Sequence, residues 1–139
     1  MMNTEKYYKF DEMNGYAFTK LQKIDDHFSI TELEPINQKS FYGKAVIIIT
    51  PFSSALFSYE TPIIVRHYDE RFDAFYYHRL YDGGYDTGRT WTDTVSPTTL
   101  RHIYAFCRMN KKEFMELPLY PNESRGWSET FSRLMMKRG

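Results

Sequence analysis

The stretch of sequence that decides the fold runs from Leu56 to Arg108 and ends in S-P-T-T-L-R-H-I-Y-A-F-C-R, residues 96–108. Ser96 is a good helix N-cap, because its hydroxyl can accept a hydrogen bond from an otherwise unpaired backbone N–H. Pro97 follows where its fixed φ suits a helix and its missing donor costs nothing. Apolar residues then recur at i, i+3, i+4 and i+7, namely Leu100, Ile103, Tyr104 and Cys107. This spacing predicts a helix over residues 96–109 whose apolar face covers a sheet.

The residues before this helix predict that sheet. The β-branched run from Val46 to Ile49 is typical of a central strand buried on both faces. Pro62 cannot donate to a ladder, so its strand is expected to lie at an edge or to be bulged there. The predicted strands span about residues 27–34, 40–50, 55–67 and 72–81.

The flanking segments are less regular. Residues 16–24 have apolar residues at helical spacing and are predicted as a short helix, although Tyr16 and Phe18 could begin a strand. Asn110 resembles the cap of a second short helix, and Pro121 with Asn122 is expected to form a linker. A C-terminal helix is then predicted from the spacing of Trp127, Phe131, Leu134 and Met135.

These elements predict an α+β fold, in which an antiparallel sheet of four to five strands is packed on one face by the central helix and the C-terminal helix. A length of 139 residues is typical of a single domain, 1–139, with a possible loose N-terminal arm over residues 1–13. The segment 82–95 is polar and contains glycine, and it is expected to form a mobile loop.

Composition narrows the function classes. Lys and Arg together equal Asp and Glu at 18 each, and a net charge of zero argues against a dedicated non-specific nucleic-acid binder and against an acidic DNA mimic. One cysteine forms no internal disulfide and favours a reducing compartment. The longest apolar run, Ala45–Ile49, is too short to span a bilayer. We therefore expect a soluble protein of the cytoplasm.

No catalytic, metal or cofactor site is predicted from the sequence. The histidines fall in four different predicted elements without compact ligand spacing: His27, His67, His78 and His102. Cys107 lies on the apolar face of its helix, where a cysteine behaves as a small hydrophobe. The glycine-rich residues 82–88 lack the lysine of a phosphate-binding loop. The sequence thus favours a non-enzymatic protein.

Two groups of residues could form a binding surface. One is a basic stripe on the predicted helix, formed by Arg101 and Arg108 and continued by Lys112. The other combines a Tyr- and Arg-rich strand face with a tryptophan of the 82–95 loop: Phe75, Tyr77, Arg79, Tyr81 and Trp91. Such residues are typical of protein interfaces, and the same residues could contact phosphates and stack on bases. A solvated helix face beside a second aromatic core layer is the structural alternative.

The segments Leu56–Ile63 and Ser96–Phe106 resemble a family of small phage-encoded proteins of unknown function. In that family a strand with an S-Y-x-T core precedes a helix that opens S-x-T-T-x-R-H-I. The similarity covers residues 56–107, and this chain differs in its longer 82–95 segment and its additional ends.

The resemblance implies a phage or prophage origin, a sheet packed by one helix, and action by binding inside the host cell. The expected partner is a host protein, with inhibition of a host defence such as CRISPR, or of another host process, as the outcome. A nucleic-acid-binding module that uses the aromatic and arginine surface is the alternative function. The resemblance assigns no catalytic residue.

Overall fold

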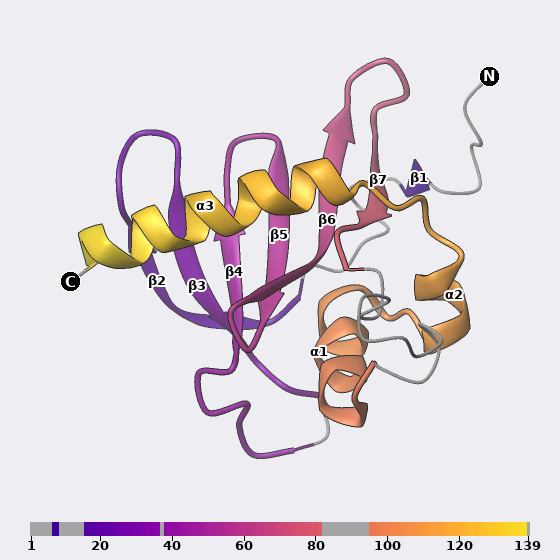
Figure 1. Cartoon of the computed structure of the whole chain (residues 1–139), viewed down its shortest axis with the longest axis horizontal. Helices are drawn as coiled ribbons and strands as arrows, with labels where there is room; N and C mark the ends of the chain where they lie inside the picture. The colour runs from indigo at the N-terminus through magenta and orange to yellow at the C-terminus, as the bar shows by residue number, and fades with distance from the viewer. Residues whose placement is uncertain (1–6, 9–15, 37, 82–94, 139) are drawn as a thin grey trace.

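The computed structural model of the chain describes residues 7–8, 16–36, 38–81 and 95–138. Within these residues the fold is α+β, as predicted, and its centre is an antiparallel sheet with strand order β1-β7-β6-β5-β4-β3-β2 (Figure 1). The strands are β1 (Tyr7–Tyr8), β2 (Phe18–Lys23), β3 (Ser29–Leu33), β4 (Ala45–Ile49), β5 (Ser53–Ser58), β6 (Thr61–Asp69) and β7 (Ala74–Arg79). The helices are α1 (Pro97–Cys107), α2 (Lys111–Met115) and α3 (Pro121–Arg138). The prediction of four to five strands was therefore too low.

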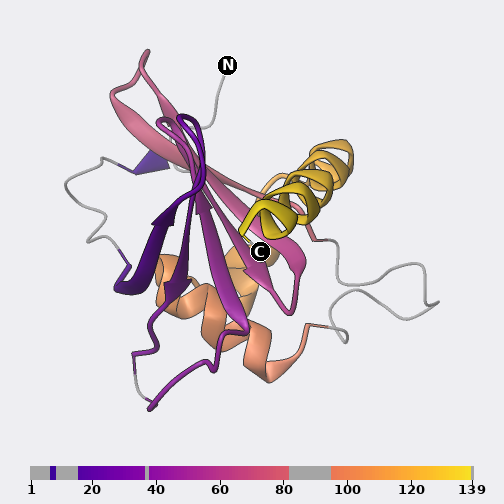
Figure 2. The same ribbon diagram turned by 90° about the vertical axis from the view of Figure 1, so that its left-hand side faces the viewer.

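The sheet is covered on both faces, whereas both long helices were predicted on one face. Ile47 belongs to the core beneath α1 and α2, while its neighbour Ile48 belongs to the core beneath α3. Successive side chains of a strand point to opposite faces, so these two cores lie on opposite sides of the sheet. Figure 2 shows the sheet edge-on between α1 and α3. Both faces of the central strands are apolar, and each face needs its own cover.

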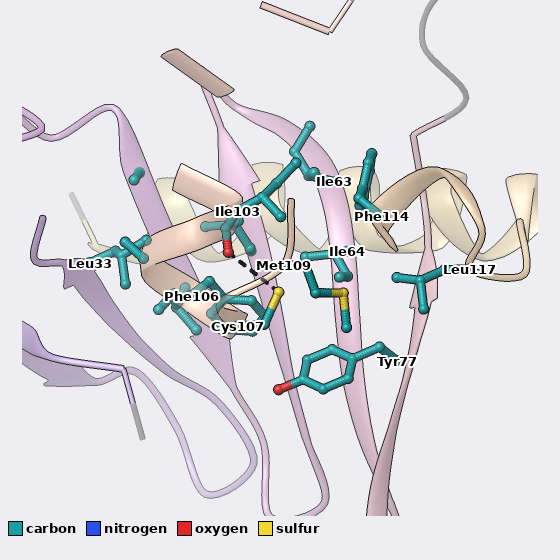
Figure 3. Packing of buried hydrophobic residues seen from close by; sticks show 14 of the residues in the cluster. Leu33, Ile63, Ile64, Tyr77, Ile103, Phe106, Cys107, Met109, Phe114 and Leu117 are labelled. Atoms are coloured by element: carbon teal, nitrogen blue, oxygen red, sulfur yellow. Dashed lines mark hydrogen bonds between the residues drawn. The ribbon is translucent and has the colours of Figure 1, made fainter. Parts of the chain in front are cut away.

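Helix α1 begins as its sequence predicts, but Tyr104, which was predicted on its apolar face, is 47% exposed on the outer side. The Ser96 side chain accepts a hydrogen bond from the Thr99 backbone N–H at 3.1 Å, and Pro97 is the first helical residue. Ile103 and Cys107 are buried against the sheet, and Figure 3 shows both in the core that α1 covers. The helix ends at Arg108, whose φ of 60° is left-handed and whose backbone N–H donates to the Tyr104 carbonyl.

The segment predicted as one strand over residues 55–67 is a hairpin. Its strands β5 and β6 are joined at Tyr59 and Glu60, which both have positive φ, 50° and 68°. A tight turn of this hand normally carries Asn or Gly, and neither is present, so the sequence does not indicate the turn. The expectation for Pro62 is confirmed, since the ladder shifts register next to it.

Residues 16–24, predicted as a short helix, contain the strand β2 instead. All six residues of β2 are exposed, and the pairing with β3 shifts register beside Lys20, whose φ is 56°. Because no side of β2 is buried, its sequence shows no alternation of apolar and polar residues. Backbone pairing with β3 holds this strand, and backbone pairing leaves little trace in the sequence.

The ends of the chain also differ from expectation. Of the predicted arm 1–13, the structure describes Tyr7 and Tyr8, which pair with Tyr76 and Phe75 of β7. The rest of the arm and residues 82–94 of the predicted loop lie outside the described residues. The capping box of α2 is present at Asn110, as predicted. Pro121 opens α3 instead of belonging to a linker.

Candidate functional site

The outward side of α1 presents a cationic aromatic surface, which we call the α1 outer face and which consists of Arg101, Tyr104 and Arg108. All three residues are exposed, Tyr104 to 47%. The Arg108 guanidinium donates to the carbonyls of Tyr104 and Ala105 at 3.2 and 2.8 Å, and it lies 5.9 Å from the Tyr104 ring centroid. These contacts fix the guanidinium in place beside the ring, on a helix without any acidic residue.

The strand residues proposed for the same surface lie elsewhere. Tyr77 is fully buried, and its ring meets Phe106 on the inner side of α1. Arg79 donates from Nε to the Leu117 carbonyl at 3.1 Å and joins β7 to the segment before α3. Tyr81 packs against the core beneath α1.

Phe75, the fourth residue of that strand face, is partly buried. Its ring lies 4.1 Å from the guanidinium of Arg66, which is itself buried. Trp91 lies outside the described residues. The structure therefore brings Arg101 and Arg108 together on one surface. It places Tyr77, Arg79 and Tyr81 beneath or beside the helices and Phe75 against Arg66 on the sheet.

A buried polar network joins β5 to α1. Ser58 Oγ lies 2.8 Å from His102 Nδ1 and 2.9 Å from Thr99 Oγ1, and Ser96 Oγ donates to Thr99 Oγ1 at 3.1 Å. These residues come from the two segments that carry the family resemblance. Burial, with a smaller effect of the Arg101 charge, lowers the pKa of His102 to about 4. Ser58 and His102 are both buried, and the pair joins α1 to the sheet.

Cys107 is also enclosed by the core. Burial raises the pKa of its thiol to about 12, and Sγ donates to the Ile103 carbonyl at 3.3 Å (Figure 3). A thiol that stays protonated and covered is a poor nucleophile.

Three further polar side chains converge on the other face of the sheet, under the start of α3. We call them the His–His–Glu cluster: His67 of β6, His78 of β7 and Glu123 of α3. His67 Nε2 lies 2.9 Å from Glu123 Oε1, and His78 Nε2 lies 3.0 Å from Glu123 Oε2. Trp127 Nε1 also donates to Glu123 Oε1, at 3.3 Å. Among the described residues, this is the group whose side chains could hold a metal ion.

The environment of the cluster favours an ionised carboxylate. Burial raises the pKa of Glu123, but the hydrogen bond from His67 and the proximity of His78 outweigh it, so the pKa lies well below its usual range. His78 is 2% exposed, while His67 and Glu123 are partly exposed. Glu123 lines an open depression together with Phe28, Thr50, Ser53, Gly126, Trp127 and Thr130.

The sequence did not indicate this cluster. Its members lie on three elements and become neighbours through two features of the fold. The first is the β6–β7 register, which pairs Val65 with His78 and His67 with Tyr76. The second is the position of α3 on that face. Glu123 lay at the start of a helix whose first residues were predicted as a linker.

Comparison with known proteins identifies a matching family whose function is unknown. A family model described as "Family of unknown function (DUF8033)" matches residues 31–117. The matched region contains the buried network, the α1 outer face and both histidines of the cluster, and it ends before Glu123. No curated protein and no solved structure matches the chain. None of the helices in the described residues is long and apolar enough to cross a membrane.

Proposed function

Because the chain belongs to this family of unknown function, we propose its function from geometry: it is a non-enzymatic protein that binds another protein through the α1 outer face. The observation that carries the proposal is Tyr104, a large aromatic residue that stays 47% exposed between two arginines. Tyr and Arg are enriched among the residues that carry most of the free energy of binding in protein interfaces.

The charge of this surface defines the partner. No carboxylate of α1 neutralises Arg101 or Arg108, because the helix contains no Asp or Glu. Arginine forms paired hydrogen bonds with carboxylates, and its planar group also stacks on aromatic rings. An acidic surface patch with an apolar centre that accepts the Tyr104 ring fits these residues.

The residues of the α1 outer face favour a protein over a nucleic acid. Nucleic-acid binding would need the strand residues as stacking platforms, yet the Tyr77 ring is buried and Arg79 already donates to a main-chain carbonyl. Two exposed arginines in a chain of zero net charge provide few phosphate contacts. Of the aromatic and arginine surface that a nucleic-acid-binding module would use, only the α1 outer face therefore remains exposed.

The biological setting follows from the resemblance noted above. In this proposal the chain is a phage-type accessory protein in the cytoplasm of the host cell, and it inhibits a host defence or another host process by occupying a host protein. Inhibition by occupation requires no catalytic group, which agrees with the burial of Ser58, His102 and Cys107.

The test compares matched variants of the same chain. Tagged wild-type protein, Arg101→Glu/Tyr104→Ala and the control Arg125→Glu are used to capture proteins from bacterial lysate. Arg125 is an exposed arginine of α3, on the opposite side of the sheet from α1. We expect one acidic protein at near-equal stoichiometry with the wild type and the control, and its loss with the double variant.

Labelled single- and double-stranded oligonucleotides, titrated at low salt, decide the class of partner. We expect no change in fluorescence anisotropy at micromolar protein. Salt-sensitive binding that the double variant abolishes would assign the surface to nucleic acid instead. Equal capture by all three proteins would remove the α1 outer face from the function.

A further inference from the structure

We propose that the His–His–Glu cluster is a binding site for one divalent transition-metal ion of the zinc class. The site lies on the α3 face of the sheet, away from the α1 outer face, and the proposal does not depend on the proposed function. It rests on the spacing of the three side chains, on the burial of His78 against the carboxylate and on the kinds of donor atoms that meet there.

The spacing suits a metal ion with short bonds. The ligand atoms of His67, His78 and Glu123 all lie within 4.8 Å of one another, and the two histidine–carboxylate distances are 2.9 and 3.0 Å. Tetrahedral zinc with bonds of about 2.0–2.1 Å places its ligand atoms about 3.3 Å apart. The observed spacing of the three ligand atoms is therefore close to that of a coordination shell.

His78 is the second, independent observation. Its side chain is 2% exposed, and neither ring nitrogen has a hydrogen-bond partner among the described residues. Nε2 lies 3.0 Å from Glu123 Oε2, which is the distance of an ion pair with that carboxylate. Buried polar groups are nearly always satisfied. An ion between His78 and Glu123 would satisfy Nε2 and leave Nδ1 as the nitrogen without a partner.

The donor set selects the class of ion. Two imidazole nitrogens and one carboxylate suit zinc, cobalt, nickel or ferrous iron, whereas calcium and magnesium prefer shells of oxygen. Two histidines and a glutamate are also a known ligand set of zinc sites that keep one position for water.

The residues around the cluster orient the Glu123 carboxylate, but none of the described residues accepts a hydrogen bond from His78 Nδ1. The Trp127 indole N–H donates to Glu123 Oε1 at 3.3 Å and holds the carboxylate towards the histidines. Metal-bound histidines usually donate their second N–H to an acceptor, and His78 Nδ1 has none among the described residues. We therefore expect a reversible site of about micromolar affinity rather than a tightly held structural zinc.

The alternative is a direct pairing of Glu123 with the histidines. In that case the cluster attaches the first turn of α3 to β6 and β7 without an ion. The two arrangements differ in a measurable way, because a metal ion requires both histidines and the carboxylate as simultaneous ligands and releases protons when it binds to a protonated site.

The test is a titration of chelator-treated full-length protein with zinc chloride and, separately, with cobalt chloride. For the wild type we expect one ion per chain by calorimetry, a rise in melting temperature with added zinc, and the intense visible absorption of four-coordinate cobalt.

Three variants locate the site. His67→Ala and Glu123→Gln should each weaken zinc binding by about tenfold or more. The control His27→Ala replaces an exposed histidine outside the cluster and should bind as the wild type does. Circular dichroism of each metal-free variant establishes that it is folded, and the partly exposed His67 supplies a variant with little effect on the core.

Two results would overturn the proposal. One is the absence of stoichiometric binding when zinc is present at about 100 times the expected micromolar dissociation constant. The other is binding that persists equally in folded His67→Ala and Glu123→Gln, which would place the ion elsewhere on the chain. In either case Glu123 would be a structural partner of the two histidines only.

Discussion

His102 shows how a single residue can be polar, buried and uncharged. Its ring is fully buried, Nδ1 is bonded to Ser58, and an edge-on contact with the Phe41 ring at 4.5 Å closes one side. The charged form would lose its hydration and face Arg101, so its pKa falls from 6.5 to about 4. The imidazole is therefore neutral at physiological pH and serves as a hydrogen-bonding link between α1 and β5.

This residue predicts an acid sensitivity of the fold. Between pH 6.5 and pH 4 the unfolded chain binds a proton at His102 that the folded chain does not, so the free energy of unfolding is highest above pH 6.5 and falls towards pH 4. The expected loss from this group is on the order of 2 kcal/mol at pH 4.5. Urea titrations at pH 7.5, 5.5 and 4.5 measure it.

The variant His102→Gln separates this effect from the titration of carboxylates. It should be less stable than the wild type at pH 7.5, and its stability should fall less between pH 7.5 and pH 4.5. Parallel losses in the two proteins would show that His102 does not titrate in this range on unfolding.

At the scale of elements, local signals decide which segments the sequence predicts. Ser96 and Pro97 correctly predict where α1 begins, and the apolar spacing correctly predicts that Ile103 and Cys107 are buried. The prediction that Tyr104 shares this buried face was wrong, since Tyr104 is 47% exposed. The β5–β6 turn carries no such local signal, because Tyr59 and Glu60 adopt positive φ at positions where Asn or Gly would be expected. The strand β2 carries no burial pattern at all.

The strained turn leads to a prediction of increased stability. Glu60 has a φ of 68° and is exposed, and a left-handed conformation costs a non-glycine residue about 1 kcal/mol or more. Glu60→Gly should therefore raise the free energy of unfolding by about 1 kcal/mol, measured by urea denaturation. Glu70→Gly is the control, since Glu70 is exposed in a turn without positive φ, and it should be neutral or destabilising. A loss of stability in Glu60→Gly would show that its side chain supports the turn.

On the scale of the whole molecule, the sheet acts as a two-sided platform. One face carries α1 and α2, and the other carries α3, where Phe131 stacks on Phe57 at 4.7 Å between centroids. The apolar run of β4 indicated that the sheet is buried on both faces. The spacing of apolar residues in α1 and α3 did not indicate which face of the sheet each helix covers. The spacing of apolar residues along a helix indicates which of its residues are buried, but not the element against which they pack.

The placement of α3 predicts a contrast between two of its residues. Leu134 is fully buried against the sheet, whereas Met136 is 82% exposed. Leu134→Ala should lower the free energy of unfolding by about 2–4 kcal/mol, because it removes buried methyl groups and leaves a cavity. Met136→Ala should change it by less than about 0.5 kcal/mol. Similar effects of the two substitutions in urea denaturation would contradict the packing of α3 on this face.

The same two-sided arrangement explains what the sequence reveals of the candidate sites. Arg101 and Arg108 lie on one helix, so their shared surface follows from helical spacing alone. The His–His–Glu cluster requires the register of β6 and β7 and the side on which α3 packs. Neither can be derived from four scattered histidines, so this cluster was accessible only through the fold.

The most direct measurement for the α1 outer face is the affinity of the captured partner, purified, for matched variants. Calorimetry should show that Arg101→Glu/Tyr104→Ala weakens binding by about 30-fold or more, as loss of a central interface residue does, while Arg125→Glu binds as the wild type. Equal affinities for the double variant and the wild type would contradict the assignment of function to this face.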